Sequence, residues 1–218
     1  MKFDPKIHHR RRIRLKGYDY SSEGAYFVTV CARDKECVLG EVIDGDMRLN
    51  SIGAIVELCW LEIPKHFENA VLDVYQVMPN HVHGIVRILD KPRRDLINQI
   101  PTTPNQRSNQ CQPAAKRANA GVQSKPEWPL MKNPKQSLGK MIRSFKALAT
   151  KKGHDAGFDS FGWQGKFYDH IIRDGRDLDR IRQYIVDNPK NWTNDDNYPE
   201  NIRVDRLHDG AGNWSSVD

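Results

Sequence analysis

Two histidines separated by one residue carry the clearest chemical signal in this chain. His81 and His83 flank Val82 within residues 79–86, at the start of an alternating apolar run. Successive side chains of a β-strand point to opposite faces, so the two imidazoles project from the same face. Paired neutral imidazoles can bind one metal ion. The alternative is a pair of histidines on a half-exposed strand face, and a third ligand and a nucleophile elsewhere would favour the metal site.

A segment near residue 180 supplies candidates for both roles. Tyr184 and Asn188 lie four residues apart, and therefore on one edge of a helix predicted over residues 178–188. Tyr184 sits to one side of the apolar positions of this helix, which are Leu178, Ile181 and Ile185. From there its hydroxyl could lie against the edge of a sheet. Alternatively, Tyr184 is an amphipathic residue at a helix boundary and Asn188 closes the helix before a proline.

Length and composition limit the class of protein. The chain of 218 residues can form one domain with a hydrophobic core, and its net charge of +6 favours a polyanionic partner. It has no apolar run long enough to span a membrane and no apolar segment typical of a secretory signal at its start. The four cysteines form no CxxC pair, which is typical of reduced thiols. We therefore expect a cytoplasmic, nucleoid-associated protein.

Apolar patterns predict the order of the elements that must position these residues. Four main strands are expected, at residues 25–32, 71–78, 81–89 and 166–173. Three helices are expected, at residues 52–63, 136–152 and 178–188. Asn50 or Ser51 caps the first and Asp177 the last, and the stop signals are Pro64, Gly153 and Pro189. The order predicts an α+β fold, a ferredoxin-like βαββαβ antiparallel sheet with helices on one face and an additional C-terminal helix.

Four shorter features complete the predicted organisation. Asp44-Gly45 is expected to turn a small hairpin within residues 38–49. Residues 1–16 form a basic arm, and residues 194–218 form a polar tail. Residues 91–134 hold seven of the twelve prolines and cannot bury enough apolar surface to offset their ordering entropy, so we expect a flexible insertion. Residues 1–193, with arm and insertion, are expected to form a single domain.

Three stretches resemble, in order and spacing, the single-tyrosine HUH transposases, whose motif is two histidines flanking a bulky apolar residue. They are residues 77–83 (VMPNHVH), 163–173 (WQGKFYDHIIR) and 184–189 (YIVDNP). The similarity is greatest to the REP-associated tyrosine transposases, and residues 14–20 and 26–30 also look like that family. The resemblance covers about residues 10–90 and 135–192, so the insertion and the tail fall outside it.

The resemblance implies a metal-dependent transposase, or nickase, that acts on single-stranded DNA. His81, His83 and Asn188 would hold Mg²⁺ or Mn²⁺, and Tyr184 would be the nucleophile. This endonuclease would cleave and rejoin hairpin-bearing or palindromic DNA through a 5′-phosphotyrosine intermediate, as DNA transposition and recombination require. Relatives of this kind act as monomers or as homodimers, and the sequence leaves that choice open.

Contacts with DNA are expected from basic side chains, with Tyr18 and Tyr20 stacking on unpaired bases. The basic residues are Arg10, Arg11, Arg12, Arg14, Lys140, Arg143 and Lys146. Tyr168 is the rival nucleophile, while structural roles are expected for His170 and Trp163. Two other functions stay open: a catalytically inactive nucleic-acid-binding module of the same fold, and a phosphodiesterase that uses water.

Overall fold

The structure is a computed structural model that describes residues 15, 17–90 and 136–201. The expected basic arm, apart from Leu15, and the expected insertion lie outside the described residues, as does the tail from residue 202. None of the described helices is long and apolar enough to cross a membrane. Cys31, Cys37 and Cys59 are free thiols, and Cys111 lies outside the described residues.

Four antiparallel strands form the main sheet. They are β1 (Gly24–Cys31), β4 (Ala70–Val77), β5 (His81–Ile88) and β6 (Tyr168–Ile172), in the spatial order β4-β5-β1-β6. β1 therefore lies between β5 and β6 and pairs antiparallel with both. Each crossover places a helix between two strands that are not neighbours in the sheet. This is the predicted ferredoxin-like arrangement.

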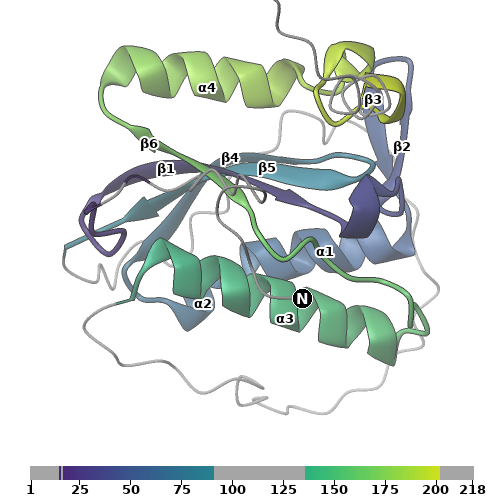
Figure 1. The fold of residues 1–218 in the computed structure, drawn as a ribbon, viewed down its shortest axis with the longest axis horizontal. Coiled ribbons are helices and arrows are strands. Elements are labelled where there is room, and N and C mark those ends of the chain that lie inside the picture. Colours follow the sequence, from purple (N-terminus) through teal and green to yellow (C-terminus); the bar gives the residue numbers. More distant parts are fainter. Residues whose placement is uncertain (1–14, 16, 91–135, 202–218) are drawn as a thin grey trace, which may run out of the picture.

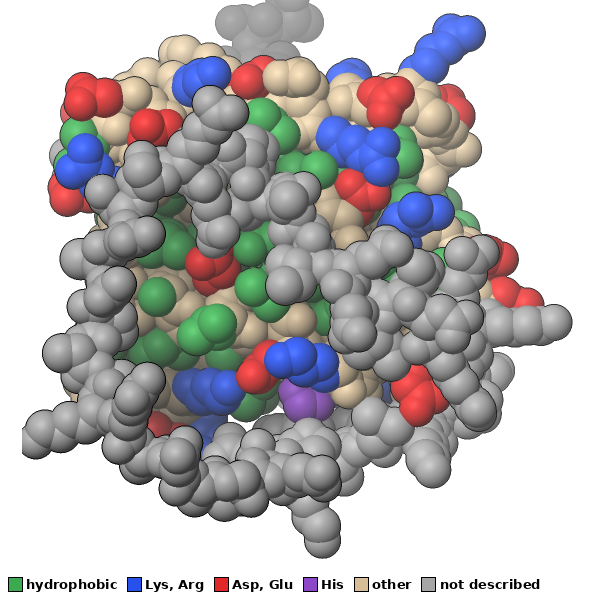
Figure 2. Space-filling view, turned by 180° about the vertical axis from the view of Figure 1, so that it is seen from behind, with side chains coloured by type: hydrophobic (Ala, Val, Ile, Leu, Met, Phe, Trp, Pro, Cys, Tyr) green, Lys and Arg blue, Asp and Glu red, His purple; other side chains and the backbone are tan. Residues whose placement is uncertain are grey.

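Helices cover both faces of this sheet (Figure 1). α1 (Ser51–Leu61), α2 (Ile63–His66) and α3 (Leu138–Asp155) lie on one face, and α4 (Gly175–Asp187) lies on the other. The additional helix thus makes a third layer on the face that the two crossover helices leave open. Acidic and basic side chains are interspersed along the upper part of the molecule, where α4 lies (Figure 2).

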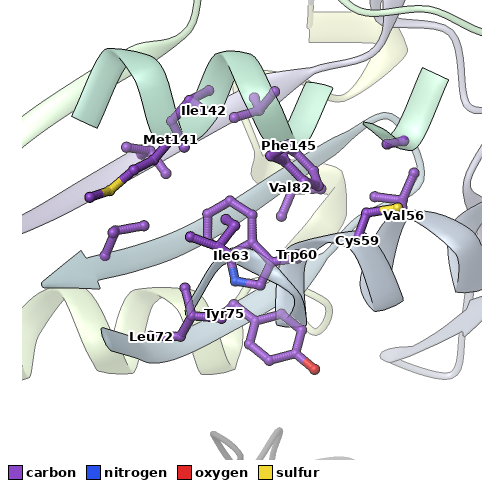
Figure 3. Packing of buried hydrophobic residues seen from close by; sticks show 14 of the residues in the cluster. Val56, Cys59, Trp60, Ile63, Leu72, Tyr75, Val82, Met141, Ile142 and Phe145 are labelled. Carbon is purple, nitrogen blue, oxygen red and sulfur yellow. The ribbon is translucent and has the colours of Figure 1, made fainter. Parts of the chain in front are cut away.

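The main core fills the space between the sheet and α1 and α3. Trp60 is fully buried at its centre and packs edge-on against Phe145, with ring centroids 5.2 Å apart (Figure 3). A Cβ atom at Gly84 would collide with the Trp60 ring. Glycine in the middle of β5 therefore makes room for the indole, an example of close packing inside a strand.

A smaller core fixes α4 on the opposite face. Its buried members are Phe27, Ile85, Ile172, Ile181 and Ile185. At the edge of this layer the Arg182 guanidinium donates to both carboxylate oxygens of Asp73, at 2.9 Å and 2.6 Å. The apolar contacts and this bidentate ion pair together hold α4 against β4 and β5.

The small hairpin is present as β2 (Gly40–Ile43) and β3 (Asp46–Leu49). Asp44 and Gly45 both have positive φ, 53° and 79°, as a two-residue type I′ turn requires. The Asn50 side chain accepts a hydrogen bond from the Gly53 amide and caps α1. Two short 3₁₀ turns, η1 (Arg33–Lys35) and η2 (Trp192–Asn194), lie outside the sheet.

Three helix boundaries differ from the prediction. α1 ends at Leu61, two residues before the predicted end, and Pro64 lies in the first turn of α2, where a missing N–H costs nothing. Gly153 lies inside α3, because it is buried and packs closely against Phe161, rather than ending the helix. Asp174 caps α4 by accepting from the amide of Asp177, the residue predicted to be the cap.

Candidate metal and tyrosine site

The histidine pair lies where strand alternation placed it. His81 and His83 project from β5 toward α4, while Val82 faces the main core. Their rings are 4.2 Å apart between centroids, and both side chains are buried. The two imidazoles therefore share one sheltered space between the sheet and the tyrosine-bearing end of α4.

Asn80 determines which nitrogen of His81 carries the proton. Its amide nitrogen donates to the carbonyl oxygens of Lys35, at 2.9 Å, and Asn197, at 2.7 Å. Its amide oxygen is therefore left to accept from His81 Nδ1, at 2.8 Å. His81 Nε2 then carries a lone pair, and this buried atom has no hydrogen-bond partner among the described residues. A carbonyl-held imidazole of this kind is the usual arrangement of a metal ligand.

His83 joins the sheet to α4. Its Nδ1 lies 2.9 Å from the Thr29 hydroxyl on the neighbouring strand. Its Nε2 lies 3.3 Å from the Tyr184 hydroxyl and 3.7 Å from Asp195 Oδ2. The predicted nucleophile is therefore within contact of the predicted metal ligand, although the two residues are 101 positions apart.

Asp195 is the residue that sequence reasoning missed. It follows η2, beyond the expected domain boundary at residue 193, and its side chain is buried in the site. Its Oδ2 accepts from the Tyr184 hydroxyl at 3.2 Å and from Asn188 Nδ2 at 2.8 Å. The ligand atoms of His81, His83 and Asp195 all lie within 4.8 Å of one another, so this group could bind a metal ion.

Asn188, the C-terminal cap of α4, lies beside the Asp195 carboxylate. Its amide nitrogen bonds Asp195, and its buried oxygen, Oδ1, has no partner among the described residues. The structure therefore brings the four predicted residues together around a carboxylate that was not predicted. Two of the three expected ligand atoms, His81 Nε2 and Asn188 Oδ1, are buried and unpaired, which fits a site built for a cation.

Burial sets the charges of the site. It lowers the pKa of both His81 and His83, against the pull of the Asp195 carboxylate. Burial also raises the pKa of Tyr184, and the negative charge of Asp195 raises it further. Burial alone would raise the pKa of Asp195, but His83 and hydrogen bonds from its other neighbours hold it well below its usual range.

These shifts leave one buried anion among neutral groups. At neutral pH the site holds two neutral imidazoles, a neutral phenol and the Asp195 carboxylate. A buried carboxylate is costly unless a cation compensates it. The buried negative charge and the unpaired lone pairs thus both indicate that these residues fit a metal ion. The ligand set would contain both nitrogen and oxygen atoms.

A groove of about 570 Å³ opens beside these residues, and we call it the site groove. Tyr184 lines it and is 46% exposed, so its ring can meet a molecule from outside. Three basic residues that the sequence did not single out also line it: Lys35, Lys166 and Arg180. The site groove therefore brings an exposed tyrosine, a metal-type ligand set and positive charge together in one place.

Tyr168 lines the same groove and is 49% exposed. Its ring lies edge-on to Phe27, with centroids 6.2 Å apart. Among the described residues, hydrogen bonds join Tyr184 and not Tyr168 to the histidine pair. His170, predicted to be structural, binds Asp177 at 2.8 Å. Geometry thus favours Tyr184 over Tyr168 as the nucleophile.

Other predicted contact residues lie elsewhere. Arg10, Arg11, Arg12 and Arg14 are outside the described residues. Lys140, Arg143 and Lys146 belong to α3, on the sheet face opposite α4. Tyr18 and Tyr20 pack edge-on against each other, and both lie against Tyr26, so their rings are engaged in packing. Trp163 packs against Phe145 and Phe161, as expected for a core residue.

Fold and site together define a ferredoxin-like protein with a buried His-x-His pair and a tyrosine-bearing helix above it. No established family profile matches the chain. An uncharacterized protein of Haemophilus influenzae is 37% identical over 199 residues, which cover 90% of this chain and 97% of that protein. The chain therefore belongs to the same family as this Haemophilus influenzae protein.

Among solved structures, the chain is similar to a REP-associated tyrosine transposase bound to a REP hairpin. The TM-score is 0.47, and the identity is 14%, over 94% of this chain and 92% of the other. That description names the family which the sequence motifs resemble.

Proposed function

We propose that the chain is a metal-dependent transposase, or nickase, that cleaves and rejoins single-stranded DNA through Tyr184. One observation supports this most directly: the Tyr184 hydroxyl contacts both His83 Nε2 and Asp195 Oδ2, beside two buried ligand atoms that have no partner. A nucleophile placed at a metal-type ligand set in an open basic groove suits attack on a phosphodiester.

The metal would be held by His81 Nε2, His83 Nε2 and Asn188 Oδ1, with Asp195 as a candidate fourth ligand. When bound, a divalent ion supplies Lewis-acid stabilisation of charge on the phosphate oxygens. Mn²⁺ suits a set of imidazole and oxygen ligands, and Mg²⁺ is the alternative that the family resemblance suggests.

The chain's own residues would perform the strand transfer. Tyr184 Oη gives up its proton and attacks phosphorus, a new O–P bond forms as the bond between phosphorus and the 3′ oxygen breaks, and the 3′ oxygen takes up a proton to leave as a free hydroxyl. Asp195 Oδ2 orients the tyrosine hydroxyl and is the nearest carboxylate that can accept its proton. The product is a 5′-phosphotyrosine linkage, which preserves the phosphodiester bond energy. The reverse attack by a 3′-hydroxyl can therefore rejoin the strand without ATP.

We take the substrate to be single-stranded DNA with a hairpin or palindromic repeat, which the resemblance implies, and we place the protein in the cytoplasm, on the nucleoid. The basic side chains of the site groove support an anionic strand as its occupant. A homodimer is not required by this chemistry, because one chain supplies both Tyr184 and the ligand set.

The decisive test is incubation of labelled, hairpin-bearing single-stranded DNA with the protein and Mn²⁺, followed by denaturing electrophoresis. We expect a covalent protein–DNA adduct that Tyr184→Phe abolishes and that the matched variant Tyr168→Phe retains. Adduct loss in Tyr168→Phe alone would reverse the assignment of the nucleophile. Nicked DNA without adduct would indicate a phosphodiesterase that uses water, and binding without cleavage would indicate an inactive binding module.

A further inference from the structure

A second groove lies beside α3, and we call it the α3 groove. Its volume is about 710 Å³, and its lining includes Arg33, Arg143, Lys146, Lys151 and His154. The single carboxylate in its lining, Asp155, is paired with Lys151 at 2.8 Å. Gln164 lines both the α3 groove and the site groove, so this residue borders both hollows.

The η1 turn places one cation in each groove. Arg33 lines the α3 groove, and Lys35, two residues later, lines the site groove. Between them the backbone turns sharply, because Asp34 and Lys35 both have positive φ, 53° and 56°. Two consecutive residues with Cβ atoms in this region are sterically unfavourable, and such conformations gather at functional sites.

Specific contacts hold this turn in place. The Arg33 amide donates to the Gly162 carbonyl at 2.9 Å, and Asn80, which also orients His81, donates to the Lys35 carbonyl at 2.9 Å. A side chain at residue 162 would collide with the Arg33 guanidinium, so glycine there lets the guanidinium lie close to the backbone. The turn is therefore tied both to the α3 groove and to the candidate metal site.

The segment that borders both grooves, at Gln164, is held in place as well. Lys146 reaches from α3 and donates to the carbonyl oxygens of Gln164 and Lys166. By contrast, neither Arg33 nor Arg143 forms an ion pair within the part of the chain that the structure describes. No carboxylate of the described residues pairs with either guanidinium group, and guanidinium is well suited to phosphate.

We propose that the α3 groove binds the phosphate backbone of the single strand that occupies the site groove, where this strand continues past Gln164. Arg33 and Arg143 would contact phosphates on the far side of the crossing, and Lys35 would contact the strand on the near side. This inference rests on the proposed function for the presence of a strand in the site groove. It adds a path along which the flanking strand runs.

The test measures how DNA binding depends on DNA length, and how this dependence changes when charges are removed from the α3 groove. It uses the Tyr184→Phe protein without metal, so that no adduct forms. Fluorescence anisotropy measures binding of a short single-stranded oligonucleotide and of versions extended at the 5′ or the 3′ end. Arg33→Ala/Arg143→Ala removes two charges from the α3 groove. Arg48→Ala/Lys65→Ala removes two charges from exposed residues that line neither groove, and is the matched control.

We expect extension at one end to tighten binding in the parent and in the control. The groove variant should bind the extended strand about tenfold more weakly, and the slope of log Kd against log salt should fall by about 1.4, or roughly 0.7 for each lost phosphate contact. The short strand should bind the parent and the groove variant equally. Lys35→Ala should weaken binding of short and extended strands alike.

Equal weakening in groove variant and control, or no gain on extension at either end, would overturn the proposal. If the double variant loses its thermal unfolding transition, Arg143→Glu serves instead, because Arg143 is exposed on α3 and its replacement should leave the fold intact. This single variant must then show the same loss of binding for the extended strand alone. Extension-dependent binding without adduct formation by the unmodified protein would overturn the strand-transfer function and leave the α3 groove assignment standing.

Discussion

Asn80 has more influence on the site than its neutral side chain suggests. Its amide oxygen fixes the proton of His81 on Nδ1, and its amide nitrogen holds the carbonyls of Lys35 and Asn197. It therefore sets the tautomer of His81 and joins three segments that are distant in sequence. Replacing a residue that orients a metal ligand in this way typically weakens metal binding.

Asn80→Ala is expected to lower the affinity for Mn²⁺ by roughly 10- to 100-fold, because His81 loses the partner that keeps Nε2 unprotonated. Isothermal titration calorimetry measures this directly. His66→Ala is the control, since it removes an imidazole from α2 rather than from the site. Unchanged affinity in Asn80→Ala would mean that His81 is not a ligand or that its tautomer is set in another way.

At the scale of elements, the packing of α1 against β5 depends on the absence of a side chain at Gly84. Gly84→Ala is expected to destabilise the protein by about 1–3 kcal/mol, because the added methyl group collides with the Trp60 ring. Chemical denaturation of the variant gives the free energy of unfolding. Trp60→Phe combined with Gly84→Ala should recover part of this loss relative to Trp60→Phe alone, and strict additivity would refute the steric explanation.

The ion pair between α4 and β4 makes a pH-dependent contribution. Burial alone would raise the pKa of Asp73, but hydrogen bonds and charge from Arg182 lower it below its ordinary value. A depressed folded-state pKa means that the stabilisation is complete above the unfolded pKa of about 3.9 and is lost as pH falls through the folded pKa.

A double-mutant cycle with Asp73→Asn and Arg182→Gln should give a coupling energy of about 1 kcal/mol at pH 7, since Arg182 is 37% exposed and solvent screens the pair. The coupling should shrink toward zero near pH 2. Urea unfolding at the two pH values measures it. Equal coupling at both values would show that the charge of Asp73 is not responsible.

Much of the element order follows from local patterns, and the exceptions have physical reasons. Runs of apolar, aromatic and β-branched residues identified β1, β4, β5 and β6, because these strands lie between the main core and the smaller core under α4. Gly153 was misread as a helix stop since its role is tertiary packing against Phe161, which no local pattern records. Asp174 and Asp177 are both good caps by type, and only the backbone path distinguishes them.

The candidate site was predictable in so far as it lies on regular elements. Strand alternation paired the histidines, and helical spacing paired Tyr184 with Asn188. Asp195 follows a short 3₁₀ turn in a polar stretch without periodicity, so its burial depends on long-range contacts alone. The cationic residues of η1 and of the site groove were missed for the same reason, because contacts between loops that are far apart in sequence leave no local pattern.

For the whole molecule, metal binding should be a source of stability, because the ligand atoms come from β5, α4 and the segment after η2. At 100 times its Kd, a ligand that binds only the folded state adds about 2.7 kcal/mol. For a domain of this size we expect a rise in Tm of roughly 5–10 °C with saturating Mn²⁺. Differential scanning calorimetry with and without EDTA measures the rise.

Variants separate this effect from nonspecific binding of the ion. His81→Ala and Asp195→Ala should abolish most of the Mn²⁺-dependent rise, whereas His154→Ala, whose imidazole binds a backbone carbonyl beside the α3 groove, should retain it. A rise that persists in His81→Ala would place the stabilising ion elsewhere on the protein.

The position of Asp195 also fixes the order in which a newly made chain becomes competent. The histidines are synthesised early, and β6 completes the sheet before α4 and Asp195 leave the ribosome. Chains are made from the N-terminus and a domain generally folds as a unit, so the sheet residues emerge while the buried carboxylate of the site is still missing. Synthesis alone thus delays the complete ligand set until the residues of the layers around it have been made.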